Sequence, residues 1–229
     1  MFDLYIRKKE DLIEAVRTFG FVPFFKNAIE GFSIEEHCAP EAWFPREGEG
    51  VWEWKGPVIR ESGCAYGKFF GGKAVFVSRE AFFDFADARR DGYDFDARTD
   101  DGLTSFRERF LYGLVADNAP ILSTRLKDLG GYGKEGKGGF ETLVNRLQHL
   151  CYLLIGDFVY PTGKDGRPYG WGLAQYTTPE ERYGDEFRRA VYRKTPREAY
   201  EATLERLARL LPAAPAPRLA ALLGQKPAR

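Results

Sequence analysis

The most informative segment of this chain covers residues 120–176 and opens with Pro120-Ile-Leu-Ser-Thr-Arg-Leu-Lys-Asp-Leu129. Its apolar residues recur at helical spacing, which predicts a short helix over Ile121–Leu129. The glycine- and lysine-rich segment Gly130–Gly139 then breaks the helical pattern. A second helix is predicted over Phe140–Tyr152, where apolar side chains again fall on one face. The segment therefore predicts two helices joined by a flexible turn.

A hairpin completes this segment. Residues Leu153–Tyr160 are strand-like, and the chain returns as Tyr169–Tyr176 after a turn around Asp165-Gly166. Two helices joined by a turn and followed by a hairpin are the parts of a winged helix-turn-helix. We therefore expect an α+β fold that contains a winged helix-turn-helix.

The preceding residues also run from helix to hairpin. An amphipathic helix is predicted over Lys9–Phe19, and Val51–Lys55 is expected to be a strand with its two tryptophans on one face. A tight Gly71-Gly72 turn predicts a hairpin between Ala65–Phe70 and Lys73–Val77. The expected architecture is therefore two tandem winged-helix-like halves packed around a shared groove.

Composition shifts suggest where the chain divides. A linker rich in aspartate and glycine, residues 91–102, follows a helix predicted over Arg79–Arg90. The expected domains are residues 1–92 and residues 103–211, the second of which closes with a helix over Glu198–Leu210. Residues 212–229 are rich in alanine and proline and are expected to form a flexible tail.

The composition restricts the classes of function. The 34 Lys and Arg residues are balanced by 34 Asp and Glu residues, so any affinity for nucleic acid must come from a local basic patch. The three cysteines are widely separated and form no C-x-x-C pair, which fits a reducing compartment. Because no secretory signal or membrane-length apolar run is present, we expect a cytoplasmic protein without a membrane partner.

The polar face of the helix Phe140–Tyr152 is the strongest candidate for a binding site. Asparagine and arginine side chains suit bidentate contacts with base edges, and lysines in the loop and the wing suit phosphates. Residues 121–149 carry only five basic against three acidic residues, so the positive excess is small. The predicted DNA-binding residues are Lys134, Lys137, Asn145, Arg146, His149, Lys164 and Arg167.

An aromatic and acidic block between residues 52 and 61 is the best place to look for a reaction. A carboxylate held between indole rings would be desolvated and could act as a general acid or base, which makes Glu53 and Glu61 catalytic candidates. Trp52 and Trp54 could stack on an extruded base. The alternative is a strand with tryptophans in the core and Glu53 paired to a neighbouring cation.

No cofactor or metal is indicated. The glycine-rich loop lacks the order of a phosphate-binding motif, because Lys137 is followed by glycine rather than by serine or threonine. His37, Cys38 and Cys64 have no fourth soft ligand nearby in the sequence, so the plain interpretation is buried thiols and a turn histidine.

Several strings resemble the bacterial AlkZ-related proteins, a group akin to the AlkZ-type winged-helix DNA glycosylases, which excise alkylated or crosslinked bases. The matching strings are Phe21-Val-Pro-Phe-Phe25, Gly31-Phe-Ser33, Trp52-Glu-Trp-Lys-Gly-Pro57, Cys64-Ala-Tyr-Gly-Lys-Phe-Phe70, Gly72-Lys-Ala74, Gly138-Gly-Phe140, Arg146-Leu-Gln148 and Asp165-Gly-Arg-Pro-Tyr-Gly-Trp-Gly172. The resemblance implies tandem winged helices, binding to duplex DNA and a role in DNA repair.

The resemblance does not carry over a catalytic pair. The AlkZ enzymes use a Gln-x-Gln pair to position the hydrolytic water, whereas the glutamines here are Gln148, Gln175 and Gln225. The leading hypothesis is thus a winged-helix DNA-binding protein related to these glycosylases and acting in repair of alkylated or crosslinked bases. The alternative is a non-catalytic winged-helix adaptor for protein or self-association.

Overall fold

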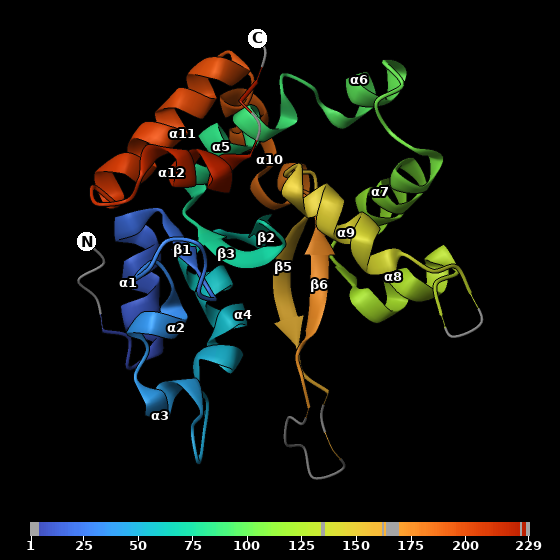
Figure 1. The fold of residues 1–229 in the computed structure, drawn as a ribbon. Helices are drawn as coiled ribbons and strands as arrows, with labels where there is room; N and C mark the ends of the chain where they lie inside the picture. Colours follow the sequence, from blue (N-terminus) through green and yellow to red (C-terminus); the bar gives the residue numbers. More distant parts are fainter. Residues whose placement is uncertain (1–4, 134–135, 162, 164–169, 225, 228–229) are drawn as a thin grey trace.

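The computed structural model describes residues 5–133, 136–161, 163, 170–224, 226 and 227. The chain has an α+β fold in which helices surround two three-stranded antiparallel sheets that lie next to each other (Figure 1). The α+β class predicted from the sequence is therefore confirmed.

The first sheet belongs to residues 9–77, which we call the N-terminal module. Its elements are α1 (Lys9–Phe19), β1 (Phe21–Pro23), α2 (Ile34–His37), α3 (Pro40–Trp43), α4 (Val51–Ser62), β2 (Ala65–Phe70) and β3 (Lys73–Val77). The strand order is β1-β3-β2, and Ala65 and Phe21 both pair with Val77. The hairpin and the first helix predicted from the sequence are confirmed.

The second sheet belongs to residues 106–177, which we call the C-terminal module. Its elements are α7 (Phe106–Asn118), β4 (Ile121–Leu122), α8 (Ser123–Gly130), α9 (Phe140–His149), β5 (Leu154–Val159) and β6 (Leu173–Thr177). The strand order is β4-β6-β5, and Ile121 and Ile155 both pair with Tyr176.

The remaining helices connect and cover the modules. They are α5 (Arg79–Arg90), α6 (Phe95–Asp100), α10 (Pro179–Ala190), α11 (Pro196–Leu210) and α12 (Ala216–Leu223). Figure 1 shows α5, α10, α11 and α12 gathered at one end of the two sheets, with α11 packed on α5 and on α12. Ser78 caps α5 by accepting a hydrogen bond from the N–H of Ala81, as its position predicts.

The two modules pack on each other reciprocally. The helix that precedes the hairpin in each module contacts the second strand of the other: α4 lies on β5, and α9 lies on β2. The strands β2 and β5 also contact each other. One continuous cluster of buried residues runs through both modules, including Val58 of α4 and Val144 of α9. The interface between the modules is therefore part of the core.

A glycine makes the contact between α4 and β5 possible. A Cβ atom added to Gly56 would lie 2.7 Å from Oδ1 of Asp157 and 3.2 Å from Nη1 of Arg60. That Arg60 nitrogen also forms an ion pair of 2.5 Å with the same Asp157 oxygen. A side chain at residue 56 would therefore separate the helix from the strand.

The structure corrects the prediction for Val51–Lys55, which belongs to helix α4 rather than to a strand. Trp52 and Trp54 alternate as in a strand, but the buried residues Val51, Trp54 and Val58 follow helical spacing. Packing of α4 against α1 and β5 outweighs the weak helical propensity of Gly56 and Pro57.

Three further segments differ from the sequence expectation. Ile121 and Leu122 form strand β4 and not the start of a helix, because they pair with β6. The predicted linker contains α6, whose Phe95 ring stacks on Tyr112 with 3.7 Å between centroids. Residues 216–223, within the predicted flexible tail, form α12 and bury Leu219, Leu222 and Leu223. Apolar contacts hold this part of the chain in place.

Candidate nucleic-acid interface

Helix α9 presents one exposed edge. Phe140, Val144 and Leu147 are buried and fix the helix on the core, while Thr142 and Arg146 on another side are exposed. The helix starts directly after Gly139, whose backbone has the left-handed conformation with φ 85° that glycine adopts without strain. The exposed edge is therefore held by a rigid element at a defined angle.

Arg146 is anchored on this edge by a carboxylate from another helix. Its Nε lies 2.5 Å from Oε1 of Glu108, which is 5% exposed and belongs to the first turn of α7. Burial alone would raise the pKa of Glu108, but hydrogen bonds from Ser105 and the charge of Arg146 outweigh it and hold that pKa below its ordinary value. Glu108 is thus a carboxylate at neutral pH.

This anchoring leaves the end of the Arg146 side chain available. The side chain is 58% exposed and has no polar partner other than Glu108 among the residues described. A guanidinium held through Nε can still offer its two terminal nitrogens as a planar fork. The sequence predicted Arg146 but missed Glu108. The Ser105-x-x-Glu108 capping box indicates a helix start, not a contact with a distant arginine.

Exposed rings and cations lie beside this edge. Phe106 and Phe110 are one helical turn apart on α7, are 70% and 37% exposed, and stack with 6.2 Å between centroids. The ammonium of Lys137 lies 5.1 Å from the Phe110 ring, and Arg107 donates a hydrogen bond to the carbonyl of Gly138. Lys137 therefore lies in the loop next to the start of α9, the position for which a DNA-binding lysine was predicted.

His149 and Asn145 differ from Arg146 in their surroundings. His149 is half-buried and receives a hydrogen bond from Arg89. Burial, followed by the charge of Arg89, lowers the pKa of His149 to about 4, so the imidazole is neutral at pH 7. The Oδ1 atom of Asn145 is buried and has no hydrogen-bond partner among the described residues. Neither residue adds positive charge to the exposed edge.

Lys134, Lys164 and Arg167 lie outside the described residues, so the structure does not place them relative to α9.

The other aromatic site lies at the start of α4. The ring of Trp52 is 5.4 Å from the rings of both Trp43 and Trp171, and 5.1 Å from that of Phe24 (centroid distances). Trp171 precedes β6 of the other module and is 74% exposed, as is Phe44 next to Trp43. Trp52 and Trp171 thus place indole rings at a boundary between the modules that is open to solvent.

Trp54 does not share this position. It is only 8% exposed and belongs to the buried cluster. It follows Trp52 by two residues, so it lies on a different side of helix α4. Because Val51–Lys55 is helical, the two indoles point in different directions. Trp54 therefore contributes to the core and offers no free ring face to a base.

Lys55 is a cation enclosed by rings. Its Nζ lies 4.3 Å from the centroid of Phe158 and 5.2 Å from that of Trp52, and no carboxylate in the described part of the chain pairs with it. Burial lowers the pKa of Lys55 to about 8, and the charge of Glu53 partly offsets that effect. The ammonium therefore loses its proton more readily than an exposed lysine does.

The two catalytic candidates have structural partners. Oε2 of Glu53 accepts a hydrogen bond of 2.9 Å from the N–H of Gly50 and so closes the start of α4. Glu61 is 47% exposed and forms an ion pair of 2.5 Å with Lys9. Each carboxylate is therefore held by a partner within the fold, Glu53 at the start of its own helix and Glu61 by α1.

Gln148, the glutamine on α9, is part of the packing between modules. It is 1% exposed, and its Oε1 accepts a hydrogen bond of 3.0 Å from the backbone N–H of Lys68 in β2. Its amide nitrogen donates to the carbonyl of Val144. The side chain is therefore occupied by the fold.

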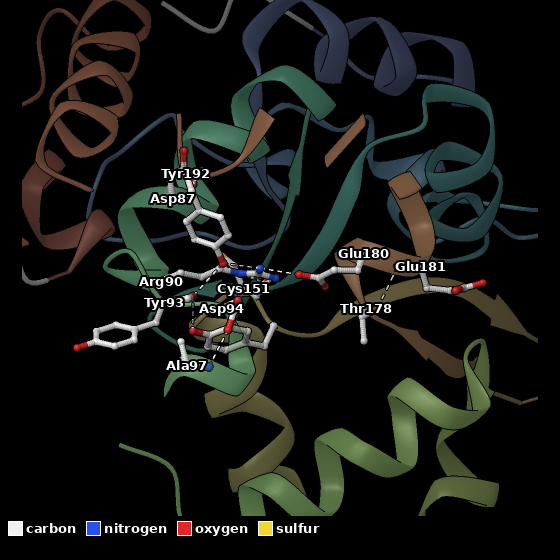
Figure 2. A network of polar contacts seen from close by, with 11 residues as sticks. Asp87, Arg90, Tyr93, Asp94, Ala97, Cys151, Thr178, Glu180, Glu181 and Tyr192 are labelled. Carbon is white, nitrogen blue, oxygen red and sulfur yellow. Dashed lines mark hydrogen bonds and ion pairs between the residues drawn. The ribbon is translucent and has the colours of Figure 1, made fainter. Parts of the chain in front are cut away.

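A buried arginine fastens α5 to the C-terminal half of the chain (Figure 2). Arg90 is fully buried, donates to Glu180 at 2.6 Å and to the carbonyl of Cys151 at 2.9 Å, and contacts the Tyr192 hydroxyl at 3.2 Å. That hydroxyl donates in turn to the carbonyl of Tyr93. The network links segments that are up to 102 residues apart, so it fixes α5 and α10 on the C-terminal module.

The described residues offer neither a metal site nor a membrane-spanning helix. No group of three or more His, Cys, Asp or Glu side chains there is placed to hold a metal ion, and Cys38, Cys64 and Cys151 are free thiols. No helix in that part of the chain combines the length and the apolar character needed to cross a membrane.

The model of one protein family, described as AlkZ related, matches residues 6–224. The match covers nearly the whole chain, so the protein belongs to the AlkZ-related family. No curated protein and no solved structure matches the chain.

Proposed function

We propose that this protein is a tandem winged-helix protein that binds duplex DNA, with the exposed edge of α9 facing the major groove. Each module runs helix, strand, helix, helix, strand, strand, with α3 as a short addition in the N-terminal module. In each sheet the third strand lies between the first and the second. This order matches a helix-turn-helix followed by a wing, whose second helix ordinarily reads base edges. Membership of the AlkZ-related family supports the same proposal.

The anchored guanidinium of Arg146 carries the proposal. An arginine fork makes two parallel hydrogen bonds to O6 and N7 of guanine, and the contact is strongest when the fork is held in advance. Glu108 holds Arg146 through Nε while 58% of the side chain stays exposed. A surface ion pair needed only for stability would not require a buried carboxylate partner. The arrangement therefore supports recognition of a base pair by α9.

The surroundings of Arg146 supply the remaining contacts of such an interface. Lys137 and Arg107 lie at the start of α9 and α7, where they can neutralise backbone phosphates. Trp171, on the hairpin of the same module, has an exposed indole that can contact the sugar-phosphate backbone or a displaced base. Because Glu108 and Glu141 offset part of this charge, we expect few phosphate contacts and modest non-specific affinity.

A titration of a labelled duplex followed by fluorescence anisotropy tests the proposal. At about 50 mM and about 200 mM salt the affinity should fall with increasing salt, because phosphate contacts release counterions. Arg146→Gln should weaken binding roughly tenfold or more, whereas Arg209→Gln, at another exposed arginine, on α11, should not. Absence of binding at low salt, or equal binding by both variants, would contradict the proposal.

Excision of damaged bases is a separate part of the hypothesis. Gln148 is buried between the modules and the chain has no Gln-x-Gln pair, so no glutamine is proposed to hold a water molecule. Glu53 stays the candidate carboxylate, although it also closes α4. Glu53→Gln keeps an acceptor oxygen for the Gly50 N–H, so the variant should fold. Loss of base release from alkylated DNA with DNA binding retained would support a catalytic role.

The adaptor alternative has one observation in its favour. Phe106 and Phe110 stay exposed together, and neighbouring Leu103 is 44% exposed, so an apolar patch lies at the start of α7. If the patch is an interface, the protein should self-associate in sedimentation experiments and Phe106→Ser should abolish that association. Self-association without any DNA binding would favour the adaptor over the DNA-binding protein.

A further inference from the structure

A large cavity lies away from α9, where α1, the end of α4, the start of α5 and α10 meet. Its volume is about 920 Å³, and its lining includes Arg17, Arg60, Arg79, Arg182 and Tyr183. Each arginine comes from a different helix, and the four span residues 17 to 182. No local pattern in the sequence therefore indicates that these four arginines lie close together.

Two of the four cations lack an opposite charge. Arg79 pairs with Glu186 at 3.2 Å, and Arg60 pairs with Asp157 at 2.5 Å. Arg17 and Arg182 pair with no carboxylate within the described chain: Arg17 donates to the carbonyl of Glu61, and Arg182 donates mainly to that of Ile59. The lining thus holds four arginines against two glutamates, a net charge of two positive units in a protein of net charge zero.

Two donors in the lining have no acceptor. The Nε of Arg182 and the hydroxyl oxygen of Tyr183 are both buried, and neither has a hydrogen-bond partner in the described part of the protein. The side chains are neighbours, with the guanidinium carbon 5.6 Å from the phenol ring. Burial raises the pKa of Tyr183, so its hydroxyl stays protonated and able to donate. Unmet buried donors are costly and call for an acceptor.

We propose that this cavity binds a phosphoryl group, with Arg182, Arg17 and Tyr183 as its ligands. A phosphoryl group carries several acceptor oxygens in a tetrahedral arrangement, which suits two guanidinium groups and a hydroxyl approaching from different helices. A single carboxylate offers only two oxygens in one plane. The volume of about 920 Å³ leaves room for the rest of a nucleotide-sized molecule.

The surface next to the cavity extends the positive charge. A second depression shares Arg79, Glu80 and Glu186 with the cavity and continues along α5 and α10 to Arg189 and, just beyond α10, Arg193. A ligand with successive phosphates, such as a nucleic acid strand or a polyphosphate, could follow this line of arginines. The site does not depend on the proposed duplex binding by α9, because none of its residues belongs to α9.

Direct titration tests the site. Pyrophosphate and a dinucleotide with a 5′-phosphate should bind saturably by calorimetry and shift the Nε–H resonance of Arg182 in an NMR spectrum. The same dinucleotide without the 5′-phosphate should bind at least about tenfold more weakly, since a hydrogen-bonded charge contributes that much or more. Failure of both phosphorylated probes to bind saturably would overturn the proposal, whatever the outcome for duplex DNA.

Two variants and a control separate binding from folding. Tyr183→Phe removes a hydroxyl that makes no hydrogen bond of good geometry among the described residues, so it should leave thermal stability intact yet weaken pyrophosphate roughly tenfold. Arg17→Gln should weaken it similarly, and Arg209→Gln on α11 should have no effect. Unchanged affinity in both cavity variants would overturn the assignment of these ligands.

Competition identifies the source of the phosphoryl group. Single-stranded DNA that displaces pyrophosphate would assign the site to a nucleic acid backbone. Saturable pyrophosphate binding that single-stranded DNA leaves unchanged would assign it to a small phosphorylated molecule. Both results support the site and differ only in its natural ligand.

Discussion

The two modules repeat the same order of elements, but the helices that precede their hairpins, α4 and α9, differ in exposure. Helix α4 of the N-terminal module is covered by β5, so only Arg60 and Glu61 at its end are exposed. Helix α9 gives β2 only one side, through Gln148, and keeps Thr142 and Arg146 exposed. One copy of the motif has thus become part of the scaffold, while the other keeps a surface on which a partner can bind.

The connections between hairpin strands differ in the same sense. In the N-terminal module the two-residue turn Gly71-Gly72 joins β2 to β3, which leaves no length for a wing. In the C-terminal module β5 ends at Val159 and β6 starts at Leu173, so a longer segment joins them. The module with the exposed helix is therefore also the module with the longer hairpin. The following predictions test this division of roles.

Removing Arg90 should have the largest effect, because it ties α5 to α10 and to the C-terminal module. Arg90→Met leaves the carboxylate of Glu180 without its partner at a largely buried position, so the free energy of unfolding should fall by about 3–5 kcal/mol. Denaturant titration measures the loss. Arg188→Met, at an exposed arginine paired to Asp185 on α10, is the control and should cost well under about 1 kcal/mol. Equal losses would show that the network does not hold α5 on the C-terminal module.

Gln148 tests the side of α9 that packs on β2. Gln148→Met keeps the volume but leaves the Lys68 N–H without its acceptor, so stability should fall by about 1–3 kcal/mol. Tyr160→Phe is the reciprocal change, because that hydroxyl donates to the carbonyl of Trp52 in α4, and it should cost about 0.5–1.5 kcal/mol. A larger loss for Tyr160→Phe would contradict the expectation that the hydrogen bond of the buried Gln148 contributes more to stability than that of the half-buried Tyr160.

Glycines on two helices test the cover over α4. Gly56→Ala brings a Cβ to within 2.7 Å of Asp157, so it should destabilise the protein by about 1–3 kcal/mol through overpacking. Gly113→Ala on α7 meets no atom within 4 Å and should stabilise the helix by about 0.5–1 kcal/mol. Chemical denaturation of both variants gives the comparison. A neutral Gly56→Ala would mean that α4 and β5 can separate at little cost.

The smallest effect concerns His149 and depends on pH. The pKa of His149 is lowered to about 4 in the folded protein, so the unfolded chain binds the proton first as the pH falls below about 6.5. The wild type should therefore lose stability relative to His149→Gln between pH 7 and pH 4, by about 1–2 kcal/mol after allowance for solvent screening. A constant difference across that range would show that His149 binds its proton as readily in the folded protein as in the unfolded chain.

Local pattern predicted much of the fold. The spacing of apolar residues in Lys9–Phe19 and the Gly71-Gly72 turn are short-range signals, and both predictions were confirmed. The same reasoning was wrong for Val51–Lys55, because alternation over five residues fits a strand as well as part of a helix. Local pattern also predicted a flexible tail that includes residues 216–223, although Leu219 and Leu222 are buried. Those residues form a helix whose apolar side chains are buried against distant parts of the chain.

The candidate sites were also predictable only where the signal lies within a short segment of the chain. Arg146 was predicted because its residue type and its place on a polar helical face are visible in the chain. The carboxylate that anchors it, Glu108, lies 38 positions earlier and reaches it only because α7 packs on α9. The cavity arginines are more distant still, with Arg17 and Arg182 on helices from opposite ends of the chain.

Periodicity, capping residues and family strings were therefore sufficient to predict the α+β class, the helix-to-hairpin order and the AlkZ-related family. Packing between distant segments determines which of the helices α4 and α9 is covered. It also determines which arginine pairs with a buried carboxylate and where cations without a carboxylate partner share a cavity. The physical reason is range. Backbone propensity and apolar spacing act over a few residues, whereas burial and charge pairing depend on groups that only the folded chain brings together.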